Sequence, residues 1–561
     1  MRLLTNFSLA VRHFNIQMRH GSSEVGKFAT VFKNYDNVET PIECELRGTP
    51  PKFLKGTMLR NGPGMYQIGD DMYKHWFDGL AYPQRYHFQD GKLFYSAKFI
   101  ETNDYMNNIN NRKIVTPSFA TYEFPDPCKK FYGRFETRFE KEDADHPTEN
   151  ANVFFRQHGD GIYACTESPI LYRIDPDSLS TLERVNAKQY VYMHTYTAHS
   201  NDDYEGNVYN IGTKFSRAHP EYIFTKTMNP ANNPNAKNRY TCEDTRIVGT
   251  VKSTAADSPC YYHSFGLTEN HFVLFEGPVR ISSKEIAIRH KMKKSYNECM
   301  FYDPSLGTNV LVVDQRTAKR TPITYKASSF FTFHHANAFE KDGNLIVDYC
   351  RMRKPDIFQA YSLENMRKGN FLNTDDMDRA AYLARMVIPL SIPKDAKVGD
   401  DLLKDIGPYG KGCSAVLREN DTIFLEDVIV TDQSFEFPRY NYDHYNLREY
   451  RYVYGSSILK YETNLAGIVK ADLVDRMNVK IWHRENQSQL CAEPVFMPNP
   501  NGKEEDDGIL VCPVMIMSGK ENPFILVLNA KDLKEMCRYI IPQDRIPFGF
   551  HSMFVQRPHT H

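Results

Sequence analysis

The stretch FFTFHHANAFEKDGNLIVDY, residues 330–349, is made of two short apolar and aromatic runs separated by the turn signal KDG. Short apolar runs flanked by Gly, Asp or Asn are typical of β-strands. His334 and His335 are adjacent in the first run, so in a strand their side chains point to opposite faces. The two histidines therefore cannot serve one site from the same face.

Similar β-like runs recur from near residue 50 to the C-terminus, with turn residues between them. Examples are KLFYSAKFI (92–100), GIYACTE (161–167), NVYNIGTKF (207–215), HFVLFEGP (271–278), TIFLEDVIV (422–430), GILVCPVMI (508–516) and FILVLNA (524–530). The best helix candidate is YSLENMRKGN (361–370), continued by DDMDRAAYLARM (375–386). No long linker divides the chain, which predicts one large all-β body, a propeller or a set of stacked sheets.

The composition excludes several classes of protein. Hydrophobic residues make up 41% and charged residues 25% of the 561, as in ordinary globular proteins. Lys and Arg (69) nearly balance Asp and Glu (70), so no nucleic-acid partner is indicated. The 11 cysteines include no CxxC pair and are interpreted as reduced thiols of an intracellular protein. No apolar run is long enough for a membrane-spanning helix, so any membrane contact is expected to be peripheral.

The first 27 residues have the features of a targeting segment. Their first acidic residue is Glu24, and apolar residues recur at steps of three and four on a face opposite three arginines: Leu3, Phe7, Val11, Phe14 and Met18 against Arg2, Arg12 and Arg19. This pattern predicts a mitochondrial presequence over residues 1–27, with a disordered tail as the alternative. Residues 28–561 are then expected to form a single domain.

Four histidines stand beside or at the mouth of separate β-like runs: His199, His263, His334 and His551. Taken singly, each is more often a structural histidine than a metal ligand. They form no local metal motif, and a shared site requires four distant strands to converge. A propeller brings strands together in this way, because the inner strands of its blades face one axis.

Ordered motifs from about Phe32 to Gln556 resemble the carotenoid cleavage oxygenases, in particular their animal branch, which includes the carotene oxygenases and a retinoid isomerase. These motifs are GTMLRNGPGMY (56–66), HWFDGLA (75–81), FPDPCKKFYGRF (124–135), ACTES (164–168), TAHSNDDYEGNVYNIG (197–212), YYHSFGLTEN (261–270), FTFHHANAFE (331–340), FEFPRYNY (435–442), AEPVFMP (492–498), EEDDGILV (504–511) and PFGFHSMF (547–554). The resemblance implies a seven-bladed β-propeller with a helical and loop cap over the active-site face.

The resemblance also implies the site. One Fe(II) per chain would be bound by His199, His263, His334 and His551, with O2 as cosubstrate and no further catalytic residue. His334 would face the metal and His335 the opposite side, as a structural histidine. Glu167, Glu436 and Glu493 would accept hydrogen bonds from the ligand imidazoles, which offers buried carboxylates the partner they need.

The substrate implied by the resemblance is a carotenoid, cleaved at a double bond. Cleavage at the 9',10' bond is favoured, because the residues within the motifs and the predicted presequence are most similar to those of the mitochondrial eccentric enzymes. Central 15,15' cleavage, retinoid isomerohydrolysis and a non-enzymatic carotenoid-binding scaffold are the alternatives.

A mitochondrial location is favoured, with cytoplasm and peripheral membrane contact as the alternative, and the oligomeric state stays open. Residues 125–139 mix aromatic and basic side chains, which is typical of an interfacial helix, although a solvated helix packed on the propeller has the same composition. The residues expected to contact the membrane are Cys128, Phe131, Tyr132 and Phe135.

Overall fold

The computed structural model describes residues 25–123, 148–216, 219–372, 380–403, 406–457, 465–476 and 478–555. The presequence candidate, up to residue 24, lies outside the described residues. The membrane-contact candidates Cys128, Phe131, Tyr132 and Phe135 lie outside them as well.

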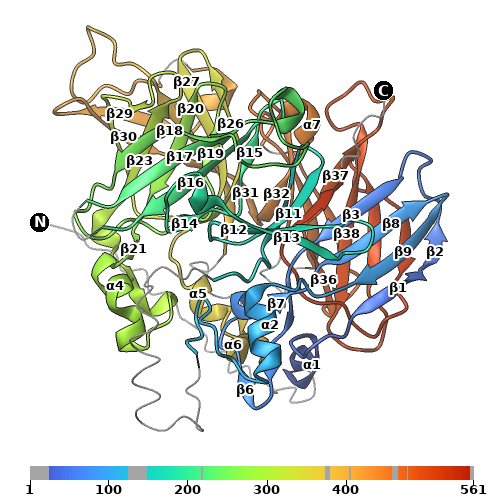
Figure 1. Cartoon of the computed structure of the whole chain (residues 1–561). Coiled ribbons are helices and arrows are strands. Elements are labelled where there is room, and N and C mark those ends of the chain that lie inside the picture. The colour runs from blue at the N-terminus through green and yellow to red at the C-terminus, as the bar shows by residue number, and fades with distance from the viewer. Residues whose placement is uncertain are drawn as a thin grey trace, which may run out of the picture.

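The regular secondary structure of the described chain is dominated by sheets of four to seven strands, paired almost entirely in antiparallel fashion (Figure 1). One sheet holds β10 (Phe154–His158), β11 (Gly161–Cys165), β12 (Ile170–Ile174) and β13 (Thr181–Asn186), and the next holds β14 (Thr195–Tyr196), β15 (Asn201–Asp202), β16 (Val208–Lys214), β17 (Glu221–Thr227) and β18 (Thr245–Lys252). The largest holds β19 (Gly266–Leu267), β20 (His271–Glu276), β23 (Thr308–Asp314), β24 (Lys319–Arg320), β25 (Thr324–Ala327), β29 (Ser414–Arg418) and β30 (Thr422–Glu426).

Two further sheets follow in the C-terminal half. The first holds β26 (Phe331–Lys341), β27 (Asn344–Met352), β28 (Tyr382–Pro389) and β31 (Val428–Ser434). The second holds β32 (Glu436–Arg439), β33 (Tyr452–Ser456), β34 (Ala466–Asp472) and β35 (Val479–His483).

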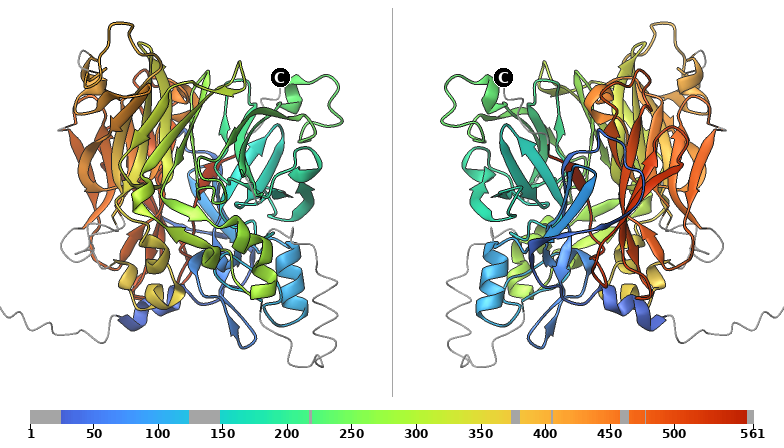
Figure 2. Two further views of the ribbon diagram at one scale, coloured as in Figure 1. Left: turned by 90° about the vertical axis from the view of Figure 1, so that its left-hand side faces the viewer. Right: turned by 90° about the vertical axis from the view of Figure 1, so that its right-hand side faces the viewer.

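Both ends of the chain share the last two sheets, in which β3 pairs with β41 and β2 pairs with β40 (Figures 1 and 2). One sheet joins β1 (Val38–Glu43), β3 (Gly56–Arg60), β8 (Gln84–Gln89) and β9 (Lys92–Ala97) to β41 (Ser552–Phe554). The other joins β2 (Glu45–Gly48) to β36 (Gln489–Cys491), β37 (Val495–Pro498), β38 (Gly508–Ile516), β39 (Phe524–Asn529) and β40 (Glu535–Ile540). This pairing of the two ends closes the ring of sheets, and the expectation of an all-β propeller is confirmed.

The described helices are short, and α1, α2, α4, α5 and α6 lie on one side of the sheets (Figures 1 and 2). Their bounds are α1 Val25–Val31, α2 Asn103–Asn110, α4 Ser283–Met292, α5 Ile357–Ala360 and α6 Leu363–Arg367, with α7 Tyr442–Tyr445 at the opposite side. None of the described helices combines the length and the apolar character needed to cross a membrane.

The predicted strands are present, including β26 and β27 around the turn KDG, although TIFLEDVIV is divided between β30 and β31. The helix over 361–370 is present as α6, but its predicted continuation is wrong, because Tyr382–Pro389 is strand β28. This strand lies between β27 and β31 and is buried on both faces. Its one charged residue, Arg385, made the segment resemble a helix with a polar side. The Arg385 guanidinium is fully buried and forms a two-point ion pair with Asp348 of β27, at 2.7 Å for each contact.

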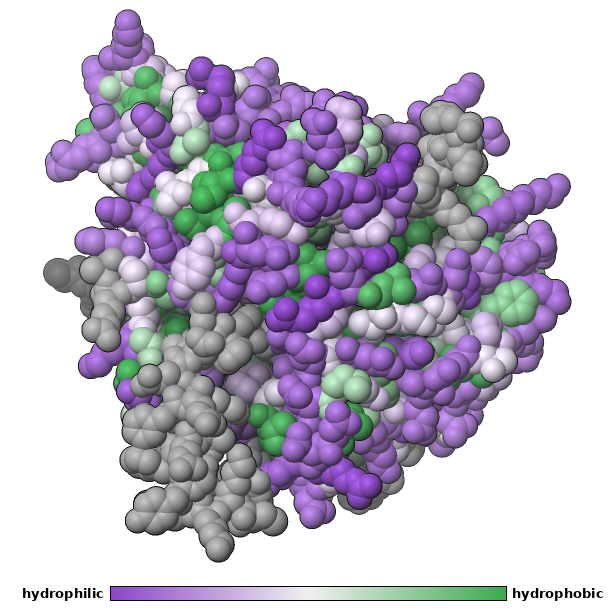
Figure 3. Space-filling view, viewed as in Figure 1, coloured by the Kyte–Doolittle hydropathy of each residue, from purple (hydrophilic) through white to green (hydrophobic). Residues whose placement is uncertain are grey.

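The apolar side chains of the sheets pack into one large core cluster and several smaller ones between neighbouring sheets. On the face shown in Figure 3, hydrophobic residues form small separated groups among hydrophilic ones. The core therefore lies between the sheets, and their inner edges are left to build the site.

Candidate metal centre

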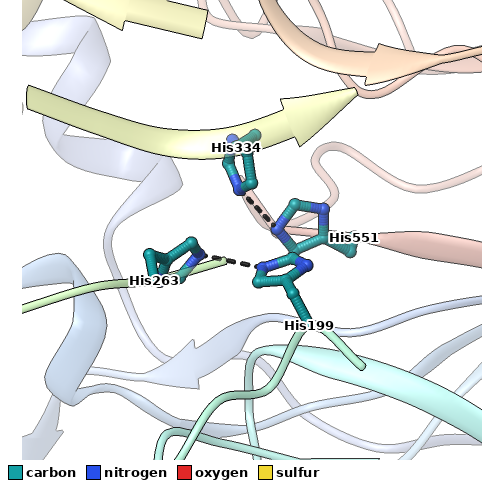
Figure 4. A group of neighbouring side chains, drawn as sticks. All are labelled: His199, His263, His334 and His551. Carbon is teal, nitrogen blue, oxygen red and sulfur yellow. Dashed lines mark hydrogen bonds between the residues drawn. The ribbon is translucent and has the colours of Figure 1, made fainter. Parts of the chain in front are cut away.

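The four predicted histidines lie together, although each comes from a different sheet (Figure 4). His199 lies between β14 and β15, and His263 lies three residues before β19. His334 lies within β26, and His551 directly precedes β41. Each of these strands lies at the edge of its own sheet, so four edges meet at one point.

The Nε2 atoms of the four rings point toward one another (Figure 4). The Nε2–Nε2 distance is 2.9 Å between His199 and His263, and 3.2 Å between His334 and His551. One ligand atom from each ring lies within 4.8 Å of all the others. Two nitrogens bound at about 2.1 Å and at right angles to one ion are about 3.0 Å apart, so this donor set fits a single transition-metal ion.

Three of the rings donate a hydrogen bond from their Nδ1–H groups to the three predicted glutamates. His263 Nδ1 lies 2.5 Å from Glu167, His334 Nδ1 lies 2.6 Å from Glu436, and His551 Nδ1 lies 3.0 Å from Glu493. Such hydrogen bonds fix the tautomer, because a ring that donates from Nδ1 leaves its Nε2 lone pair for a metal. Within the described chain, no carboxylate contacts the His199 ring in the same way.

Burial favours the neutral form of three of these imidazoles, those of His199, His263 and His551. It lowers the pKa of His199 well below its usual value, and the neighbouring His551, His263 and His334 rings lower it further. Burial also lowers the pKa of His551 to about 4 and holds that of His263 below its usual value, although the glutamates oppose both shifts. Neutral imidazole is the form that binds a metal, so these three rings are in the metal-binding form at neutral pH.

Two hydroxyl groups tie the histidine-bearing segments to one another. Thr197 Oγ1 donates to the His263 carbonyl and accepts from the His199 amide at 3.1 Å. Ser264 Oγ donates to the Phe333 carbonyl at 2.6 Å and accepts from the His335 amide at 2.9 Å. These contacts link three of the four segments directly and restrict how far their rings can move apart.

The two histidines of β26 lie on opposite faces of the strand. His334 faces the cluster, while the His335 ring packs against Phe275 and Tyr349 on the opposite face, with centroids at 4.9 and 6.1 Å. His335 Nδ1 lies 2.8 Å from Ser264 Oγ. The pairing of β26 with β27 is irregular on both sides of His335, and such irregularities re-aim side chains.

A cavity whose wall includes many aromatic side chains reaches the histidine cluster. The His263 ring lies 5.2 Å from Phe333, Phe333 lies 6.2 Å from Phe77, and Phe77 lies 5.7 Å from Phe550, measured between ring centroids. Basic and polar side chains line other parts of the cavity, among them Lys188, His194 and Arg289. The cavity therefore suits a long apolar molecule placed against the four imidazoles.

Several residues of the site carry no local signal that sequence reasoning used. Tyr261 donates to Glu167 at 2.8 Å, and Arg439 lies 3.6 Å from Glu493. Both lie inside motifs that contain predicted site residues, YYHSFGLTEN and FEFPRYNY. Their proximity to the motif histidine and glutamate was the only available signal, and it does not distinguish them from core residues.

The model of a protein family described as retinal pigment epithelial membrane protein matches residues 31–556. The chain belongs to the carotenoid cleavage oxygenase family. It is 32% identical over 518 residues to beta,beta-carotene 15,15'-dioxygenase of Mus musculus, covering 92% of this chain and 89% of the relative. It is 31% identical over 527 residues to the mitochondrial carotenoid-cleaving dioxygenase of Homo sapiens, covering 92% and 88%.

Among solved structures, a Glu150Asp mutant of Synechocystis apocarotenoid oxygenase has the same fold. Its TM-score with this family member is 0.72 at 20% identity, covering 95% of this chain and 99% of that chain. At this identity the similarity shows the fold alone.

Proposed function

We propose that this protein is a non-haem iron dioxygenase that cleaves a double bond of carotenoids to aldehyde or ketone products. The observation that carries the proposal is the convergence of four imidazole Nε2 atoms beside an aromatic cavity. Relatives that align with 92% of the chain are named as carotenoid dioxygenases. His199, His263, His334 and His551 would hold one Fe(II), and imidazole is a suitable ligand for iron.

Iron(II) held by these histidines would supply the chemistry that activates O2. The protein's own task is to orient the rings and keep them neutral. Glu167, Glu436 and Glu493 orient three of the four rings through Nδ1, and burial favours the neutral form of His199, His263 and His551. Four neutral ligands leave the full dication charge in place, which favours the ferrous state.

The cavity wall would select and position the polyene. Aromatic side chains next to the histidines, such as Phe77, Phe333 and Phe550, offer flat apolar surfaces and keep water from the reacting bond. The bond held nearest the histidines is the bond cleaved, because placement decides which atoms react.

We propose cleavage at the 9',10' bond, with central 15,15' cleavage of β-carotene as the alternative. The presequence-like N-terminus and the similarity to a relative named as mitochondrial support the first, while the similarity to a 15,15'-dioxygenase supports the second. Purified protein incubated with β-carotene and with a xanthophyll should yield an apocarotenal and a shorter ionone-type fragment. Retinal as the sole product from β-carotene would refute 9',10' cleavage, and products lacking label from ¹⁸O2 would refute a dioxygenase.

The remaining organisation is proposed on the same basis. The sheets of four or more strands number seven in the described chain, which supports seven blades within one domain over residues 28–561. Ile286 and Arg289 of α4 line the cavity, which supports a helical and loop cap on that side. We also propose a mitochondrial location for the protein.

Helix α4 supports peripheral membrane contact. Its residues Ile288 and Met292 are exposed, although Ile286 of the same helix lines the cavity. An exposed apolar edge next to the cavity suits a site whose substrate arrives from a membrane. We expect the wild-type protein to sediment with phospholipid vesicles. An Ile288→Ser/Met292→Ser variant should lose this sedimentation.

A further inference from the structure

The three glutamates beside the histidines differ in their second partner. Glu167 also accepts from the Tyr261 hydroxyl at 2.8 Å, and Glu436 also accepts from the Phe437 amide at 3.0 Å. Glu493 instead has Arg439 Nε at 3.6 Å from its Oε1 atom. Among the described residues, therefore, Glu493 is the one member of the three that pairs with an arginine.

Arg439 is fixed in this position by the same strand that supplies Glu436. Strand β32 carries Glu436 at its start and Arg439 at its end. The Arg439 guanidinium donates to the Ser552 carbonyl, and the Ser552 amide donates to Glu493 Oε2 at 2.6 Å. Since Ser552 follows His551, Arg439 contacts both the backbone and the carboxylate that orient this ring.

The charge of the centre becomes balanced only when Arg439 is included. A divalent ion with four neutral imidazoles carries 2+, and the three glutamates contribute 3−, which leaves 1−. The Arg439 guanidinium brings the sum to zero. Glu493 has 3% and Arg439 22% of its side chain exposed, so a missing charge here is only partly compensated by water.

We propose that Arg439 is a positioning residue for the metal centre, which orients His551 through Glu493 and Ser552 and balances the charge so that the ferrous state is retained. The proposal rests on the proposed function, because it assumes that the four histidines bind iron. Loss of the guanidinium leaves a net negative charge around the ion. Negative charge stabilises the ferric ion more than the ferrous ion, so the variant should oxidise more readily.

The test uses full-length iron-loaded protein and four variants with different charge sums. Arg439→Gln leaves 1−, Glu493→Gln leaves 1+, and the Arg439→Gln/Glu493→Gln double variant returns to zero. Arg439→Lys keeps the charge but lacks the guanidinium fork. The ferric fraction is read by EPR at one fixed redox poise, and the iron content of each protein is measured beside it.

At that poise we expect the ferric:ferrous ratio to rise at least about threefold in Arg439→Gln and to fall in Glu493→Gln. The double variant and Arg439→Lys should lie near the wild type. Equal ratios in all variants, or shifts of one sign, would overturn the proposal, since a purely structural role gives no dependence on the charge sum. If Arg439→Gln does not fold, comparison of Glu493→Gln with the double variant and the wild type still tests whether the ferric:ferrous ratio depends on the charge sum. Wild-type protein without iron would refute the proposed function itself.

Discussion

The two faces of strand β26 place adjacent residues of the same kind in opposite environments. On one face, the His334 ring points to three other histidines and pairs with Glu436 at 2.6 Å. On the other face, the His335 ring is enclosed by Phe275 and Tyr349, and its Nε2 has no hydrogen-bond partner among the described residues. The partners of each ring, rather than the residue type, make one histidine a metal-ligand candidate and the other a core residue.

The largest expected effect separates the two faces directly. His334→Ala should reduce the iron content to less than about a tenth of the wild-type value and abolish carotenoid cleavage, because one of four ligands is lost. His335→Gln should retain iron and lose mainly thermal stability. Iron analysis and melting temperatures of both purified variants check this expectation. Equal iron loss in the two would remove the distinction between the faces.

The next effect concerns the partner of His334. Glu436→Gln keeps the shape of the side chain but removes its charge, so it should weaken iron binding by about 10–100-fold. Equilibrium dialysis against a competing chelator measures this affinity. Glu426→Gln, an exposed position on β30, is the matched control and should leave the affinity unchanged. An unchanged affinity in Glu436→Gln would mean that the carboxylate does not support the ligand.

A smaller effect is expected at Ser264, whose hydroxyl contacts the β26 backbone on either side of His334 and also the His335 ring. Ser264→Ala leaves the His335 amide and the Phe333 carbonyl without their hydroxyl partner, which should reduce the free energy of unfolding by about 1–3 kcal/mol. Because these Ser264 hydrogen bonds link the His263 and His334 segments, iron affinity should also fall, but by less than in Glu436→Gln. Urea denaturation and the same dialysis assay measure the two effects. Full stability with full iron affinity would show that the Ser264 hydrogen bonds are dispensable.

The smallest effect lies at the far end of β26. Burial alone would raise the pKa of Glu340, but hydrogen bonds from His271, Thr268 and Asn270 lower it to about 2. Stability from this group is therefore present above pH 4.5 and is lost as the pH falls toward 2. Glu340→Gln should show a weaker decline in melting temperature over this range than the wild type. An identical decline in both proteins would contradict the assignment.

The sequence predicted the strands well where each apolar run was short and flanked by turn residues, as in β26 and β27. It failed at Tyr382–Pro389, because a strand buried on both faces shows no alternation of apolar and polar residues. Arg385 was interpreted as a polar residue on a helix surface, whereas it is buried in an ion pair with Asp348. The four histidines and three glutamates were predicted from motifs. Arg439, Thr197 and Ser264 were not, since their roles depend on contacts between segments 66 to 113 residues apart.

X-ray absorption at the iron edge, combined with metal analysis of the active purified protein, tests most directly whether the four imidazoles bind one ion. We predict one iron per chain and a first shell containing four imidazole nitrogens at about 2.1 Å. Active protein that contains no iron, or a first shell with fewer than four imidazoles, would contradict the metal centre described above.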